Sequence, residues 1–418
     1  MEQKYFPIKT ATACQLKWNW STIRLYDGTT SSCHRVDSDL LTPETFQNFH
    51  NTPKKLADRQ LMLQGKWPQG GCEYCKVIED AGGSSDRMFH TSIPNMAPPE
   101  LETTPTATEV TPQIVEVYFD NVCNMKCLYC WDGFSSQIHA ENLKFGRFEK
   151  QGVVIDNSAK LLDNTKKELT ENFWQWMTAN HDKIKRFHVL GGEPFYQEQF
   201  DTCLEFLKEH PSPELELNIV SNLKVTRHKL EKILDTIHDL VKQSKIKRFD
   251  LTASIDCFGP EQEYVRSGID VQQWMENFKL VADQSWITLN INQTLTCLTI
   301  KTVPELLKFV NKLRAQREIG HYFSTVVMTH ECLHPGIFGS GFFSADFDAI
   351  LAEMPSDTWQ QQEARKYMLG IKSQIDSCER SDTKIEQLVV FLDEMDRRRN
   401  SNWKQVFPWI EKEIQYVV

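Results

Sequence analysis

The sequence predicts an α/β fold in which helices cover a parallel sheet of six strands. Apolar, strand-like runs recur along the middle of the chain, helical patterns separate most of them, and turn-forming residues mark their ends. Because parallel strands need a long crossover, usually a helix, these β–α steps indicate one parallel sheet with its helices packed outside it. The strands are expected at residues 114–120, 186–192, 215–222, 248–256, 287–296 and 322–328.

The length, composition and net charge of the chain limit the classes of protein to which it can belong. The chain has 418 residues, enough for two or three domains or one large domain with appendages. Its 40% of hydrophobic and 25% of charged residues are ordinary for a globular protein, and the net charge of -10 argues against a nucleic-acid partner. The first residues lack the apolar core of a signal peptide, and no apolar run approaches the roughly 18 residues of a membrane span. We therefore expect a cytoplasmic protein with no membrane partner.

Four regions are expected along the chain. Residues 1–90 are rich in Cys, Trp and Gly, and "STIRLYDGTTSSC" alternates apolar and polar residues around Asp27-Gly28, which predicts a β-hairpin. Residues 91–113 contain five prolines without periodicity and are predicted to be an extended linker, on the order of 60 Å long. Residues 114–335 carry the predicted sheet. Residues 336–418 are predicted to be a helical extension.

The twelve cysteines fall into two kinds. In a reducing compartment they are not expected to form a disulfide framework. Scattered cysteines in apolar patterns are usually small buried hydrophobes, whereas cysteines clustered beside turn formers are usually metal ligands. The scattered set comprises Cys203, Cys257, Cys297, Cys332 and Cys378. The clustered set comprises Cys14, Cys33, Cys72, Cys75, Cys123, Cys127 and Cys130.

Three of the clustered cysteines lie within eight residues, directly after the first predicted strand: Cys123, Cys127 and Cys130. We call them the cysteine triad. Three thiolates on one short loop cannot readily surround a tetrahedral zinc ion unless a fourth ligand arrives from elsewhere. They can hold three irons of a [4Fe–4S] cluster and leave the fourth iron open to a ligand. Zinc binding and chance burial remain the alternatives, although the end of a strand is where functional residues of such folds gather.

The spacing C-x3-C-x2-C, with Tyr129 before the last cysteine, resembles the signature of radical S-adenosylmethionine (SAM) enzymes. The resemblance covers about residues 114–330 and implies a partial (β/α)6 barrel of the TIM type. "LGGEP" is similar to the element of that family that holds the SAM amino group, "SID" to its ribose-binding strand, and "YVRSG" to the segment whose arginine pairs with the SAM carboxylate. The implied cofactor-binding residues are Tyr129, Gly191, Gly192, Glu193, Ser221, Asn222, Ser254, Asp256 and Arg266.

Each implied role has a physical reason. Glycines let the backbone approach a ligand closely, a carboxylate suits an ammonium group, and an arginine fork suits a carboxylate. Ser254 and Asp256 would hold the ribose, and Ser221 and Asn222 would lie beside the ribose or the cluster. The implied chemistry is reductive cleavage of SAM to methionine and a 5'-deoxyadenosyl radical, which then abstracts a hydrogen atom from a substrate.

The remaining clustered cysteines form a complete set of four thiolates: Cys14, Cys33, Cys72 and Cys75. We call this set the four-cysteine site. It resembles the twitch module, a short relative of the SPASM domain, which holds an auxiliary [4Fe–4S] cluster, while a zinc knuckle is the alternative at similar spacing. In enzymes with a twitch module, the module follows the barrel, whereas here it precedes it. The linker is long enough to wrap the module back against the open side of the barrel, and that placement is a hypothesis.

A cluster with four protein ligands has no open iron, so this second site implies electron transfer or pocket shaping rather than substrate binding.

The resemblance implies an oxidoreductase-like enzyme acting on a peptide, by crosslinking, epimerisation or oxidation, or alternatively a small-molecule dehydrogenase. A rival from another class is a non-catalytic zinc-binding interaction module. Cys257, directly after Asp256, is a candidate hydrogen-atom donor, with a buried hydrophobe as the alternative. A low-potential electron donor such as flavodoxin or ferredoxin is the expected partner. Residues 131–160 form a long insertion, either a lid or a solvated loop, and residues 396–400 ("DRRRN") are expected to be a charge run at a helix C-terminus.

Overall fold

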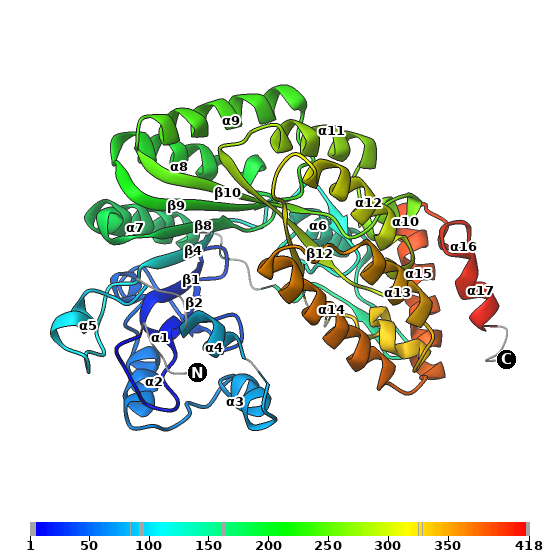
Figure 1. Ribbon diagram of the computed structural model, residues 1–418, viewed down its shortest axis with the longest axis horizontal. Helices are drawn as coiled ribbons and strands as arrows, with labels where there is room; N and C mark the ends of the chain where they lie inside the picture. The colour runs from blue at the N-terminus through cyan, green and yellow to red at the C-terminus, as the bar shows by residue number, and fades with distance from the viewer. Residues whose placement is uncertain are drawn as a thin grey trace.

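The computed structural model describes residues 6–83, 85–91, 96–159, 162, 164–324, 326–327 and 329–414. Its centre is a nine-stranded sheet with the order β13-β12-β10-β9-β8-β4-β1-β2-β3 (Figure 1). Six of these strands are parallel neighbours in sequence order, which confirms the predicted parallel sheet. They are β4 (Ile114–Tyr118), β8 (Arg186–Leu190), β9 (Ser212–Ser221), β10 (Ile246–Ser254), β12 (Ile287–Thr294) and β13 (Gly320–Ser324). Residues 325 and 328 of the sixth predicted strand lie outside the described residues.

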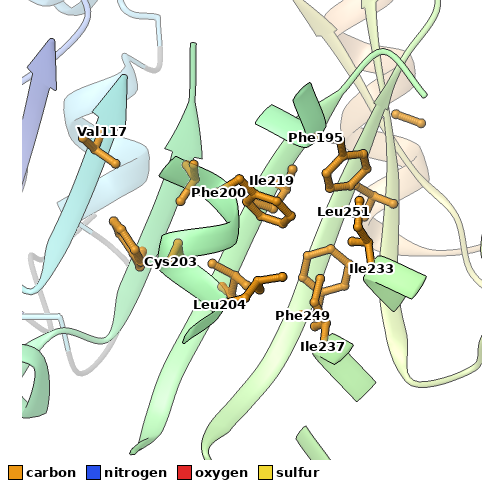
Figure 2. Close-up of a cluster of buried hydrophobic side chains, with 14 of the residues drawn as sticks. Val117, Phe195, Phe200, Cys203, Leu204, Ile219, Ile233, Ile237, Phe249 and Leu251 are labelled. Carbon is orange, nitrogen blue, oxygen red and sulfur yellow. The ribbon is translucent and has the colours of Figure 1, made fainter. Parts of the chain in front are cut away.

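Helices connect the parallel strands, as the sequence predicts. They are α7 (Thr165–Asn180), α8 (Glu198–Glu209), α9 (Arg227–Lys242), α11 (Val271–Ala282) and α12 (Val303–Arg314). Their apolar sides pack on one face of the sheet, where Leu204 of α8 and Ile237 of α9 meet Ile219 and Phe249 of the strands (Figure 2). Cys203 lies fully buried in the same layer, as expected for a scattered cysteine.

The opposite face of the sheet carries polar side chains. Glu116, His188, Asn218, Asp250 and Thr288 are in-register neighbours on β4, β8, β9, β10 and β12. In-register neighbours of a parallel sheet share a face, so these residues form one polar row across it. The apolar residues that alternate with them, such as Val117 and Leu251, belong to the hydrophobic layer under the helices.

The N-terminal hairpin forms as predicted, but it is part of the main sheet. β1 (Trp20–Arg24) pairs antiparallel with β2 (Thr29–Ser31) around Gly28, whose φ of +66° suits glycine. β1 also pairs in parallel with β4, from Trp20 opposite Ile114 to Arg24 opposite Tyr118, and β3 (Asp39–Leu40) pairs with β2. The hairpin signal is local and carries no information about the second edge of β1, so this continuity was not predicted.

The expectation of an extended linker over residues 91–113 is corrected. Residues 92–95 lie outside the described residues, and the apolar residues of the remainder pack against the N-terminal segment. Met96, Leu101 and Val110 are buried, and the Trp18 indole donates a hydrogen bond to the carbonyl of Ala107 at 2.8 Å. The prolines keep the segment irregular, whereas the apolar residues between them gain free energy by leaving water.

Further elements surround this frame. Before the linker lie α1 (Gln15–Asn19), α2 (Pro53–Leu63), α3 (Glu73–Asp80) and α4 (Asp86–Thr91), and within it α5 (Glu100–Thr103). Between β4 and α7 lie β5 (Lys126–Cys127), α6 (Ser136–Phe145), β6 (Phe148–Lys150) and β7 (Val153–Ile155); α10 (Pro260–Val265) and β11 (Arg266–Ser267) follow β10. Short 3-10 helices occupy Phe46–Asn48, His181–Lys183, Pro194–Tyr196, Ile300–Thr302, Glu331–Leu333 and Pro335–Phe338.

The C-terminal part is helical, as expected. It comprises α13 (Ser344–Glu353), α14 (Trp359–Asp376), α15 (Asp382–Arg399), α16 (Trp403–Val406) and α17 (Pro408–Ile414). These helices share a second hydrophobic core, which includes Phe347, Leu388, Phe391 and Trp403. Among the described helices, none is both long and apolar enough to cross a membrane.

Candidate functional site

The cysteine triad lies on the loop that follows β4, at the carboxyl ends of the parallel strands. A second loop, after β8, is bound directly to it. The backbone N–H of Gly192 donates to the carbonyl of Asp120 at 3.1 Å, and that of Glu193 donates to the carbonyl of Val122 at 2.8 Å. Val122 immediately precedes Cys123, so the "LGGEP" segment holds the base of the cysteine loop.

Both glycines of this segment are required by the close approach of the two loops. A Cβ atom at Gly191 would lie 2.5 Å from the carbonyl oxygen of Asp120, and Gly191 has a φ of +123°. A Cβ atom at Gly192 would lie 2.2 Å from the carbonyl oxygen of Val122. The structure therefore gives these glycines a packing role between protein segments, in addition to any approach of a ligand.

Glu193 is buried and accepts three hydrogen bonds from neighbouring donors. Its carboxylate accepts hydrogen bonds from the Ser221 hydroxyl at 2.8 Å, the Asn222 backbone N–H at 2.7 Å and the Phe195 backbone N–H at 3.2 Å. Burial raises the pKa of Glu193 to about 7, although these hydrogen bonds oppose the shift. The Asn222 side chain also donates to Asn124 at 2.9 Å, which ties the carboxylate to the cysteine loop.

Asp256 and Arg266 form a buried, bidentate ion pair. The Nε and Nη2 atoms of Arg266 donate to the two carboxylate oxygens of Asp256, each at 2.9 Å, and the side chains are 7% and 0% exposed. Asp256 also accepts from the Tyr129 hydroxyl at 2.6 Å and from the backbone N–H of Thr294 at 2.9 Å. The two groups for which the sequence implied separate SAM contacts therefore lie together and hold each other in position.

The segment that contains Arg266 runs beside the cysteine loop. β11 pairs antiparallel with β5, which places Arg266 opposite Cys127, and the backbone N–H of Leu128 donates to the carbonyl of Val265 at 2.8 Å. The Arg266 guanidinium lies 5.6 Å from the centre of the Tyr129 ring. Segments that are far apart in the sequence thus converge on the cysteine triad.

The triad supplies thiols, the ligand type that iron–sulfur clusters take. Burial raises the pKa of the Cys123 thiol to about 12 and holds the pKa values of Cys127 and Cys130 above their usual range. Neighbouring triad cysteines also raise the pKa values of Cys123 and Cys130 through charge repulsion, so the three thiols lie near one another. In the part of the chain that the structure describes, no group of three or more His, Cys, Asp or Glu side chains could hold a metal ion as placed. In a [4Fe–4S] cluster each thiolate binds its own iron, and three thiols match three irons.

The four-cysteine site is assembled from separate segments. Cys14 precedes α1, Cys33 follows β2, Cys72 precedes α3, and Cys75 lies within α3. The glycine loop before α3 lies against the loop that contains Cys33, because a Cβ atom at Gly71 would be 1.9 Å from the carbonyl oxygen of Arg35. Burial, followed by the charges of neighbouring cysteines, raises the pKa of the Cys14 thiol to about 12.

A buried lysine accompanies this site and was not predicted. The Nζ atom of Lys17 lies 2.5 Å from Asp58, and both side chains are less than a tenth exposed. Burial alone would lower the pKa of Lys17, but the neighbouring Cys72 and Asp58 raise it. Lys17 is thus a positive charge beside thiols. Its only sequence signal is its position three residues after Cys14.

The two cysteine groups lie at opposite ends of the sheet. The four-cysteine site is at the amino end of β1, and the triad is beyond the carboxyl end of β4, which pairs in register and in parallel with β1. The five paired residues span about 16 Å at about 3.3 Å per residue, and both groups lie outside that span.

Cys257 and Ser254 lie at the end of β10. Cys257 is fully buried in the second hydrophobic core, and its backbone N–H donates to the Gln262 side chain at 2.9 Å. That environment matches the alternative role of a small buried hydrophobe. Gln262 also accepts from the backbone N–H of Asp256 at 3.1 Å, and it had no sequence signal.

The insertion after the triad is held by the C-terminal helix α15. Glu141 of α6 accepts from Lys126 in the cysteine loop at 2.7 Å and pairs with Arg399 of α15 at 2.9 Å. Arg398 is fully buried and donates to Asn142 at 2.9 Å. Residues 396–400 lie at the C-terminal end of a helix, as expected. Arg398 and Arg399 also bind side chains of α6, so the run is more than a set of charges at a helix end.

Comparison with known proteins supports the enzyme class that the sequence motifs indicate. No protein-family model matches the chain. It is 20% identical over 208 residues to the probable GTP 3',8-cyclase of Methanocaldococcus jannaschii, an alignment that covers 49% of this chain and 57% of the cyclase. The chain thus spans little more than half the length of this relative. The similarity and the order of the motifs support a radical SAM superfamily enzyme.

Among solved structures, similar chains include SuiB of Streptococcus suis. SuiB bound to S-adenosylmethionine has 15% identity and a TM-score of 0.35, with 73% of this chain and 62% of SuiB covered. SuiB bound to its precursor peptide SuiA has 13% identity and a TM-score of 0.35, with 73% and 63% covered.

Proposed function

We propose that the chain is a radical SAM enzyme whose cysteine triad binds a [4Fe–4S] cluster with one open iron. The observation that carries this proposal is the convergence of three separate segments on one loop. The "LGGEP" segment bonds to Val122, Asp256 bonds to Tyr129, and Arg266 pairs with the backbone at Cys127. When bound, the cluster and SAM would supply the radical chemistry that removes a hydrogen atom from the substrate.

The surrounding residues would bind and orient SAM. Glu193 would receive the SAM ammonium group, and Ser221 and Asn222 already hold its carboxylate in one orientation. Asp256 would fix the guanidinium of Arg266 through two hydrogen bonds, so that little side-chain freedom is lost when SAM binds. Ser254 remains a proposed ribose contact.

A peptide is the proposed substrate, and the four-cysteine site is proposed to hold a second [4Fe–4S] cluster in a twitch-like module. Support for both is the resemblance of the four cysteines to that module, whose enzymes often modify peptides. Lys17 adds support, because a buried positive charge stabilises a site that gathers thiolates. Flavodoxin or ferredoxin is the proposed electron donor.

A small-molecule substrate is the second candidate. The observation that favours it is the sequence similarity to a protein named for action on GTP. A nucleotide would then replace the peptide, while the cluster and SAM would keep the same proposed places.

The test is a metal and turnover measurement on anaerobically reconstituted protein. Iron, sulfide and zinc are counted per chain, and 5'-deoxyadenosine is measured after chemical reduction with SAM present. We expect about eight irons per chain and SAM cleavage, with cleavage lost in Cys127→Ala and retained in the matched control Cys378→Ala. Zinc at the triad, or cleavage that survives Cys127→Ala, would refute the proposal.

A further inference from the structure

A large cleft opens at the amino ends of the strands. Its volume is about 1580 Å³, and its walls come from α4, the starts of β12 and β13, and α14. Pockets for small ligands are usually about 300–1,000 Å³. The cleft therefore has room for more than one metabolite-sized molecule.

The cleft is separate from the candidate SAM site. Trp20, Ile287 and Gly320 line it, and each begins a strand of the parallel sheet. Asp256 and the cysteine triad follow β10 and β4 of the same sheet and lie beyond its opposite end, at the carboxyl ends of those strands. Cys33 of the four-cysteine site, by contrast, is part of the cleft wall.

Aromatic side chains stand on two sides of the cleft. Phe89 of α4 is 57% exposed, and Trp359 and Tyr367 of α14 are 63% and 45% exposed. Figure 1 places α4 and α14 on either side of the region beneath the sheet. Large aromatic side chains that bury on association are typical anchors of peptide and protein partners.

The arginines of the cleft are engaged within the protein. Arg35 pairs with Asp86 at 3.3 Å, Arg314 donates to the carbonyl of Ile319 at 3.0 Å, and Arg317 donates to the carbonyl of Gln284 at 2.8 Å. Phosphate recognition relies on arginine forks directed at the ligand. Arg314 and Arg317 thus point at backbone carbonyls, and the charge of Arg35 is offset by Asp86 in the cleft wall, which disfavours a nucleotide or nucleic acid as the occupant.

The floor of the cleft offers polar groups. His34 lies 3.5 Å from the buried Glu116, and the Trp20 ring meets His34 and His90 edge to face, with centroids 5.8 and 5.9 Å apart. Asn290 of β12 also lines the cleft. A peptide needs both kinds of partner, because its side chains seek apolar anchors and its backbone seeks hydrogen bonds.

We propose that this cleft binds an extended peptide segment with aromatic or aliphatic side chains. The assignment of this segment to the enzyme's substrate rests on the proposed function. In that case the segment belongs to the peptide substrate and docks at the end of the sheet opposite the radical site. Recognition and chemistry would then occupy different ends of one sheet.

The test pans a displayed library of random 12-residue peptides on the reconstituted protein. The enriched peptides are synthesised, and their dissociation constants are measured for the wild type, for Trp359→Ala/Tyr367→Ala, and for Leu40→Ala/Leu143→Ala, which removes exposed apolar side chains elsewhere. We expect binding at least tenfold weaker in the first variant and unchanged in the second. Hydrogen exchange of the wild type should slow in α4 and α14 when peptide is bound.

Three results would overturn the proposal: no enrichment over an empty support, equal binding to both variants, or slowed exchange only outside α4 and α14. Wild-type cleavage of SAM without peptide is measured separately. If SAM cleavage is absent but peptides bind the cleft, the proposed function fails and the peptide site stands. If SAM cleavage is present but peptides do not bind the cleft, the peptide site fails and the radical chemistry stands.

Discussion

The cysteine triad and the four-cysteine site bring their thiols together in different ways. The triad lies on one short loop, held by backbone hydrogen bonds from the loop after β8 and by pairing with β11. The four-cysteine site draws its thiols from separate segments, and Cys14 and Cys72 are buried. Under the proposed function, the triad would leave one iron of its cluster open to a ligand, whereas four thiolates would occupy every iron of a second cluster.

Both groups have a buried cation beside them. Arg266 lies next to Cys127 and is neutralised by Asp256, whereas Lys17 lies next to Cys72 and is neutralised by Asp58. A buried charge is tolerated only with a partner, so each cation depends on its carboxylate. The comparison teaches that both cysteine groups have a buried cation paired with a carboxylate beside them, although one group lies on a single loop and the other is drawn from separate segments.

The largest expected effect comes from removing either set of thiols. Replacing Cys123, Cys127 and Cys130 by Ala should remove about half of the iron and abolish SAM cleavage, because the open iron is lost. Replacing Cys14, Cys33, Cys72 and Cys75 by Ala should remove the other half and leave SAM cleavage measurable. Iron analysis and 5'-deoxyadenosine assays check both, and loss of SAM cleavage from the second variant alone would reverse the assigned roles.

The Asp256→Asn substitution should be strongly destabilising. It leaves the Arg266 charge buried without a partner, a change that costs about 3–5 kcal/mol of unfolding free energy. Urea unfolding measures this loss of unfolding free energy. Asp250→Asn is the control, because its partner Arg248 is 42% exposed and water can screen the charge that remains, so a smaller loss is expected. Equal losses in the two variants would mean that the fully buried pair contributes no more than a pair with one exposed partner.

Stability should depend on pH through Glu193. Its pKa is about 7 in the folded chain against an ordinary value of 4.5, so between these values the folded state keeps a proton that the unfolded state has lost. The unfolding free energy should therefore fall by up to about 3 kcal/mol as pH rises from 4.5 to 7, and level off above 7. Urea unfolding at several pH values compares the wild type with Glu193→Gln, which should show the smaller fall. An identical pH profile in the variant would contradict this assignment.

The smallest expected effect is at Lys17. Lys17→Met removes the cation beside the four-cysteine site and leaves Asp58 with the more distant Lys54, at 3.6 Å. A loss of about 1–3 kcal/mol of unfolding free energy is expected, with lower metal content at the four-cysteine site only. Metal analysis in a background without the triad thiols isolates that site. Unchanged metal content there would separate Lys17 from the chemistry of the thiols.

The sequence by itself determined the parallel sheet, its helices and the hairpin. All are local patterns: alternating or continuous apolar runs, amphipathic helices and the Asp27-Gly28 turn. It also placed the triad on a loop after a strand, because the three cysteines are neighbours in the chain. The grouping of the residues around Glu193 followed from one rule, that parallel strands bring their carboxyl ends together.

Only the tertiary structure decided which groups touch. Several contacts join segments that are separate in the chain. They are the pairing of β1 with β4, the Asp256–Arg266 and Lys17–Asp58 ion pairs, and the contacts of α15 with α6. Local periodicity shows which residues are buried but not what they meet, since partner choice depends on how the elements pack. The cleft at the amino ends of the strands arises for the same reason, because its walls come from both ends of the chain.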